Sequence, residues 1–111
     1  CSCYKTGVIM ELIKKLSEHI EDEIADMECY AKLAIEVKEE YPVLAESLYS
    51  ISTQEENHTK ILHEKTEAII KKYRETNGEV PSDMMVIYEY LHKRHIEEYE
   101  KAKRYQQMYK N

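Results

Sequence analysis

The chain has 111 residues, 34% of them charged, and a formal net charge of −6 at pH 7. This length suits one domain that buries roughly 65% of the surface exposed by its unfolded chain. The negative charge argues against a nucleic-acid partner, and no apolar run approaches the about 18 residues of a membrane span. With only two Gly and two Pro, the composition predicts an all-α fold of long helices joined by short turns.

Three cysteines are an odd number and do not fit the disulfide framework of a secreted protein, so we expect a cytoplasmic protein. Cys1 is interpreted as a processed or trimmed terminus, with a lipidated cysteine as the alternative. Cys1 and Cys3 could bind a metal or form a small-loop disulfide, but two cysteines do not complete a zinc or iron–sulfur site. Residues 1–7 are expected to form an N-terminal arm before a helical domain that spans residues 8–111. Cys29 is expected to be a small buried residue, with no base placed to activate it.

The first helix is predicted from Val8 to Glu40, because the residue before Pro42 is pushed out of the helical region. One carboxylate, Glu23, falls within the apolar stripe of this helix. The stripe has the three-and-four spacing of one buried face and consists of Ile9, Ile13, Leu16, Ile20, Met27, Tyr30, Ala34, Val37 and Tyr41.

The second helix is predicted from Pro42 to Thr76, with Asn77-Gly78 as a left-handed cap. Glu55 and His58 interrupt its apolar stripe, which consists of Leu44, Leu48, Ile51, Leu62, Ile69 and Tyr73. Residues three apart lie side by side on a helix, so both groups are expected in one small volume of the core. A buried carboxylate needs a partner there, and a metal ion suits the spacing Glu-x-x-His.

The short junction before Pro42 makes the first two helices antiparallel neighbours, with Glu23 and Glu55 offset by roughly 7 Å along the axis. A third helix follows the turn 77–83 and runs to the C-terminus. His95 and Glu98 interrupt its stripe, which consists of Met84, Ile87 or Tyr88, Leu91, Ala102, Tyr105 and Tyr109. The histidines His19, His63 and His92 lie off the stripes and are expected at the surface.

The candidate metal ligands are therefore Glu23, Glu55, His58, His95 and Glu98. Three carboxylates and two imidazoles without a thiolate suit Fe, Mn or Zn. The competing interpretation is a set of solvated residues on long charged helices, since a chain with 22 acids will match Glu-x-x-His by chance. Glu89-Tyr-Leu-His92 is such a match.

The arrangement resembles the rubrerythrin-type, ferritin-like di-iron proteins over about residues 10–109. The first half of that family's pattern is similar to Glu23-x6-Tyr30 followed by Glu55-Glu-Asn-His58. The third helix of the family is similar to Glu98-x6-Tyr105. The resemblance implies an antiparallel, ferritin-like three-helix bundle with a site for one or two Fe ions, or for Mn or Zn. Glu23, Glu55, His58 and Glu98 would be ligands, and Tyr30 and Tyr105 would donate hydrogen bonds to carboxylates.

The chain ends after the third helix, so the second Glu-x-x-His arm of the family and any rubredoxin-like module are missing. Either His95 replaces the missing imidazole within the chain, or a second chain supplies the missing helix, as in the short encapsulated ferritins. Because three helices alone would leave apolar surface exposed, we expect a homo-oligomer, a dimer or larger. An electron donor or an encapsulating shell would be a further partner.

The function expected from these features is oxidation of Fe(II) or reduction of peroxide at the carboxylate and histidine site. Two alternatives stay open. One is a metal-binding or cargo protein without turnover. The other is a metal-free helical module that binds a partner helix in an open groove.

Overall fold

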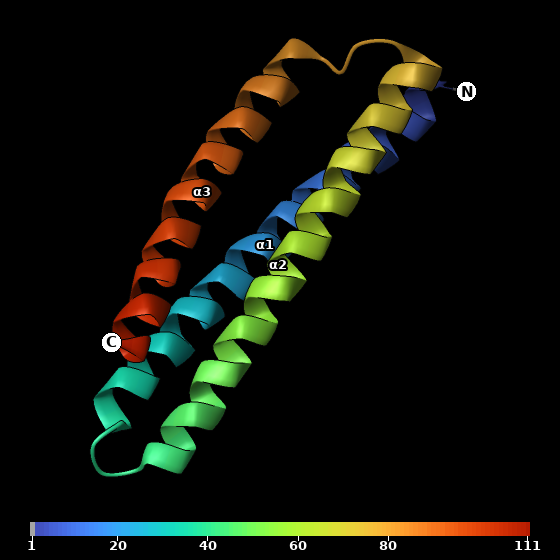
Figure 1. The fold of residues 1–111 in the computed structure, drawn as a ribbon. Coiled ribbons are helices and arrows are strands. Elements are labelled where there is room, and N and C mark those ends of the chain that lie inside the picture. Colours follow the sequence, from blue (N-terminus) through green and yellow to red (C-terminus); the bar gives the residue numbers. More distant parts are fainter. Residues whose placement is uncertain (1) are drawn as a thin grey trace.

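The computed structural model describes the backbone of residues 2–111 and the side chains of residues 7–111. It consists of the helices α1 (Ser2–Val37), α2 (Pro42–Asn77) and α3 (Ser82–Lys110), without a strand in that range. α2 returns alongside α1, and α3 runs back towards the α1–α2 turn (Figure 1). The molecule is an elongated helical bundle of 59 × 19 × 17 Å, which confirms the predicted all-α class. No helix of the described part is long and apolar enough to cross a membrane.

The helix ends follow local signals in the sequence. Pro42 is the first residue of α2, where its missing N–H needs no partner. Gly78 has a φ of 85°, which a glycine adopts without strain, and its N–H donates to the Arg74 carbonyl at 3.2 Å. Its ψ of −161° differs from that of the predicted left-handed cap. α1 begins at Ser2, earlier than the expected Val8, because no proline interrupts the preceding residues. The predictions for Cys1 and for the Cys3 side chain lie outside the described residues.

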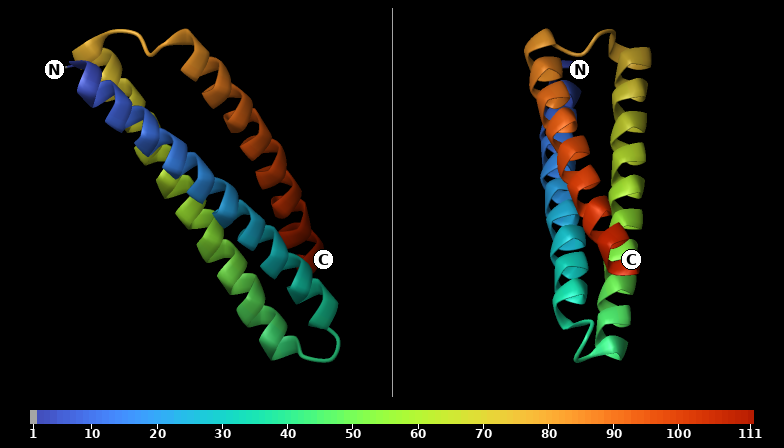
Figure 2. Two further views of the ribbon diagram at one scale, coloured as in Figure 1. Left: turned by 180° about the vertical axis from the view of Figure 1, so that it is seen from behind. Right: turned by 60° about the vertical axis from the view of Figure 1, so that its left-hand side comes forward.

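α1 is the central helix of the bundle. It packs closely against both α2 and α3, whereas α3 approaches α2 much less. α3 lies apart from the other helices at its start and comes closer towards its C-terminal end (Figure 2). The buried residues of α1 recur every three or four positions and include Ile13, Ser17, Ile20, Ile24, Met27, Ala31 and Ala34.

The buried face of α2 is rotated by about one residue from the predicted stripe. Leu44, expected in the core, is 49% exposed. The prediction was wrong here because several buried positions are polar and small, and their hydroxyls bond to main-chain carbonyls. Thr59 donates to the Glu55 carbonyl at 3.0 Å and Thr66 to the Leu62 carbonyl at 2.7 Å. The face consists of Ala45, Leu48, Ser52, Glu56, Thr59, Thr66, Ile70 and Tyr73.

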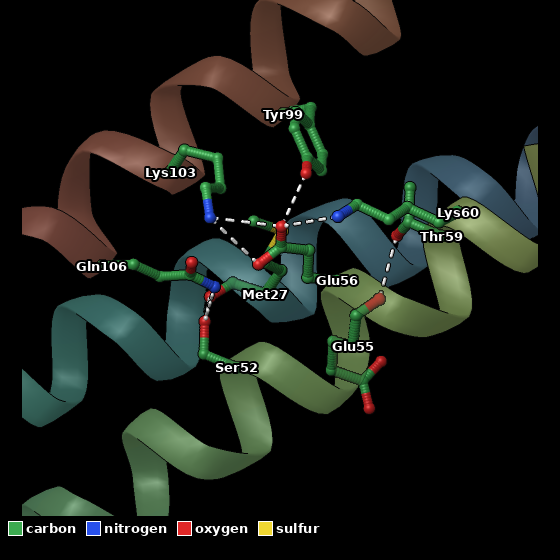
Figure 3. A network of polar contacts seen from close by, with 9 residues as sticks. All are labelled: Met27, Ser52, Glu55, Glu56, Thr59, Lys60, Tyr99, Lys103 and Gln106. Atoms are coloured by element: carbon green, nitrogen blue, oxygen red, sulfur yellow. Dashed lines mark hydrogen bonds and ion pairs between the residues drawn. The ribbon is translucent and has the colours of Figure 1, made fainter.

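Ser52 connects all three helices through hydrogen bonds. Its hydroxyl donates to the Met27 carbonyl of α1 at 2.6 Å and accepts from Gln106 Nε2 of α3 at 2.9 Å (Figure 3). Ser52 and Gln106 are both buried. Removal of the hydroxyl therefore leaves a buried amide donor without an acceptor.

We predict that Ser52→Ala lowers the free energy of unfolding by about 1–3 kcal/mol because of this unpaired donor. Urea unfolding followed by far-ultraviolet circular dichroism measures the change. Ser47→Ala removes an exposed serine of the same helix and should alter the unfolding free energy by less than about 0.5 kcal/mol. Equal losses in the two variants would contradict the assigned role of Ser52.

Candidate metal centre

Glu23 of α1 and Glu55 and His58 of α2 come together in the structure. Each offers a ligand atom, and these atoms all lie within 4.8 Å of one another. His58 Nδ1 is 3.4 Å from Glu23 Oε2 and 3.8 Å from Glu55 Oε1. The side chains of Glu23 and Glu55 are 26% and 17% exposed, and that of His58 is 53% exposed. The three groups therefore form a partly open cluster rather than a sealed core site.

The Glu23 carboxylate is incompletely satisfied. Its Oε2 atom is buried and accepts no hydrogen bond from residues 7–111. A buried carboxylate oxygen without a donor is costly, so a bound cation or a protonated imidazole would stabilise it. Two carboxylates and one imidazole suit Fe, Mn or Zn.

The cluster lies on the side of the α1–α2 pair that faces away from α3. Glu21 of α1 pairs with Arg94 of α3 at 3.2 Å, and Glu23 lies roughly 160° around the helix axis from Glu21. On α2, Glu56 bonds to α3, and His58 is again roughly 160° away. Side chains of α3 are therefore on the opposite side from this cluster.

His95 and Glu98 of α3 do not join the three clustered ligands. His95 is buried at 8% exposure, and its Nε2 has no hydrogen-bond partner among the described side chains. Burial lowers the pKa of His95 below its ordinary 6.5, against the opposing effect of the Glu21 carboxylate. Glu98 is half-buried and forms no hydrogen bond or ion pair within the described range. A single chain thus brings together three of the five predicted ligands.

The two tyrosines expected beside the ligands have other surroundings. Tyr30 packs against the cluster of Ala34, Ala45 and Leu48. The ring of Tyr105 lies below Lys32 Nζ, which is 5.4 Å from its centroid. Neither hydroxyl bonds to a carboxylate of residues 7–111, so the geometry implied by the resemblance is absent from the single chain.

Glu56, next to Glu55, belongs to a different set of contacts. Its carboxylate accepts hydrogen bonds from Tyr99 at 2.6 Å and from Lys103 at 3.3 Å, and lies 3.4 Å from Lys60 Nζ (Figure 3). Burial alone would raise the pKa of Glu56, but the bonds from Tyr99 and Lys103 and the charges of both lysines lower it overall. Glu56 is therefore a structural carboxylate whose negative charge is balanced by neighbouring lysines. Glu55 points away from these donors.

A second cluster was not predicted from the sequence. His63 and Glu67 of α2 and His92 of α3 also offer ligand atoms within 4.8 Å of one another. His63 and His92 were expected to be separate surface residues. The spacing of four between His63 and Glu67 is a helical signal, but the pairing with α3 cannot be read from one sequence. Cys29, expected to be buried, is exposed.

No known family model, curated protein or solved structure matches the chain. Its function is therefore inferred from the geometry of the site.

Glu55 and Glu56 form a matched pair for separating a candidate ligand from a structural carboxylate. In chelator-treated protein at pH 7, Glu56→Gln should lower the free energy of unfolding by about 1–3 kcal/mol, because Lys60 and Lys103 lose their ion partner. Glu55→Gln removes a carboxylate that accepts no hydrogen bond from residues 7–111. It should change the free energy of unfolding by less than about 0.5 kcal/mol. Urea unfolding measures both.

The effect of Glu56→Gln should depend on pH. Because the pKa of Glu56 is lower in the folded state, its carboxylate stabilises the fold above the ordinary value of 4.5. This contribution is lost as the pH falls through the lowered pKa. The assignment would be contradicted if wild type and variant differed in free energy of unfolding by the same amount at pH 7 and at a pH well below 4.5.

Proposed function

We propose that Glu23, Glu55 and His58 form one half of a ferritin-like iron site, which a second copy of the chain completes. The observation that carries this proposal is the buried Glu23 Oε2, which has no hydrogen-bond donor among residues 7–111 and lies among two further ligand groups. Two copies would supply four carboxylates and two imidazoles. That is the ligand set of helical di-iron carboxylate sites, with Glu from two helices and Glu-x-x-His from two others.

The surface around the cluster supports pairing of two copies. Leu12 of α1 and Leu44 of α2 are 41% and 49% exposed. Leu12 precedes Glu23, and Leu44 precedes Glu55, by about three helical turns, so each leucine lies on the same side of its helix as the glutamate. Exposed apolar residues on the same face as a half-complete site favour an interface. A two-fold axis through it would place two α1–α2 pairs together as a four-helix bundle.

Bound iron would supply the redox chemistry, which is oxidation of Fe(II) or reduction of peroxide. The carboxylates of Glu23 and Glu55 would hold the ions and neutralise their charge. His58 would supply the nitrogen ligand of each half. The apolar residues of the interface would exclude bulk water from the ligands.

The exposed leucines also favour a second candidate function. A metal-free interaction module would use the same apolar face to bind a partner helix. Glu23 and Glu55 would then be dispensable for association, and the protein would take up no iron. Iron uptake without a reaction with O2 would instead indicate binding or storage without turnover.

Anaerobic Fe(II) titration tests the proposed ligands. The wild type should bind about one Fe per chain, which is two per pair. Glu55→Ala and His58→Ala should each abolish this binding, because each removes a ligand from both halves. Glu64→Gln alters an exposed glutamate of the same helix and should bind as the wild type does. Unchanged stoichiometry in both ligand variants would refute the assignment.

Subsequent exposure to O2 distinguishes the redox function from storage. A new near-ultraviolet absorption band that appears on oxidation supports redox turnover. Bound iron without spectral change supports storage.

The shared site predicts that iron binding depends on association of two chains. Leu44→Glu places a charge in the proposed interface, so it should shift the mass measured by light scattering towards the 13.3 kDa of one chain and weaken iron binding. Val86→Glu, at an exposed apolar residue of α3, should change neither the mass nor the iron binding. A monomeric Leu44→Glu variant that binds iron as tightly as the wild type would exclude a shared site.

A further inference from the structure

We infer that His63, Glu67 and His92 form a second metal site, which takes a borderline divalent cation such as Zn²⁺ and fastens α3 to α2. Their ligand atoms lie within 4.8 Å of one another. His63 Nε2 is 3.9 Å from Glu67 Oε1, and the rings of His63 and His92 stack with centroids 4.8 Å apart. Two imidazoles and one carboxylate are a ligand set of open zinc sites, in which water takes the fourth position.

Tyr88 of α3 positions two of these three ligands. Its hydroxyl donates a hydrogen bond to Glu67 Oε1 at 2.5 Å. Its ring meets His92 edge-on, with centroids 6.0 Å apart. Such outer contacts orient carboxylate and imidazole ligands before the metal arrives. The spacing of four in both helices, 63–67 and 88–92, puts each pair of side chains on one face.

The charges around the cluster suit a cation. No lysine or arginine of the described part pairs with Glu67, so its carboxylate lacks a permanent counter-charge. His95, one turn after His92, is not one of the three clustered groups, but its buried Nε2 also has no hydrogen-bond partner among the described side chains. The cluster therefore places two imidazoles beside a carboxylate that no lysine or arginine of the described part neutralises.

This site is separate from the Glu23 cluster. His63 lies roughly 140° around α2 from His58, on the side that faces α3. α3 approaches α2 much less than α1 does, and its first turns border a cavity of about 650 Å³ lined mainly by residues of α1 and α3, Tyr88 among them. A cation bound by both helices would restrain this end of α3 and so stabilise the fold.

The test is a Zn²⁺ titration of a parent variant that lacks the cysteine thiols and one ligand of the proposed iron site. Serine replaces Cys1, Cys3 and Cys29, and Glu55→Ala removes a ligand of the proposed iron site. The parent should bind about one Zn²⁺ per chain. Zn²⁺ at about 100 times its Kd should raise Tm by on the order of 10 °C, because only the folded state holds the three ligands together.

Substitutions in this parent identify the ligands. His63→Ala and His92→Ala should each abolish the rise in Tm. Tyr88→Phe keeps all three ligands but loses the hydrogen bond to Glu67, and should weaken binding about 10–100-fold. His19→Ala changes an exposed histidine of α1 and should bind as the parent does. Circular dichroism without metal checks that each variant stays helical.

Two results would overturn the inference. One is a folded parent that takes up no Zn²⁺, and the other is an unchanged Kd in both His63→Ala and His92→Ala. Co²⁺ substitution gives a second readout, because its visible spectrum reports nitrogen ligation and should disappear in either variant. Because the parent already lacks Glu55, failure of this test leaves the proposed iron site unaffected.

Discussion

The buried carboxylate of Glu56 determines which face of α2 is turned towards α3. It accepts hydrogen bonds from Tyr99 and Lys103, and one turn earlier Ser52 accepts a bond from Gln106. An unpaired polar group in such a position costs more than an imperfect apolar contact, so these bonds can specify the rotation of α2 where apolar contact with α3 is sparse. With Glu56 turned towards α3, neighbouring Glu55 faces the open side of the α1–α2 pair.

This rotation separates two groups of potential metal ligands with different chemistry. The group on the open side has two carboxylates and one imidazole, and the group between α2 and α3 has two imidazoles and one carboxylate. An oxygen-rich set suits iron, and a nitrogen-rich set suits zinc or a similar borderline cation. The first would be completed by a second copy of the chain, which would pack on the face of α2 where Leu44 is exposed. The second needs only one chain, because its ligands already come from two helices.

The features that could be predicted from sequence depend on local rules. Pro42 and Gly78 set helix ends through their own backbone chemistry, and helical spacing together with a short turn was enough to bring Glu23 near Glu55. The rotation of α2 was not predictable in the same way, because hydroxyl groups bonded to the main chain occupy much of its buried face. The position of α3 depends on contacts between residues far apart in the sequence. This is why His95 was expected beside Glu23 and Glu55, with which the single chain does not group it, and why the pairing of His63 with His92 was not foreseen.

The most direct test of a shared iron site is a crystal structure of the chain grown with Fe(II) and measured at the iron absorption edge. The proposed function predicts anomalous density between Glu23, Glu55 and His58 of one copy and the same residues of a two-fold-related copy. Density only at residues of α3, with none between the two copies, would contradict it. So would a Glu23 carboxylate without iron in crystals that contain Fe(II).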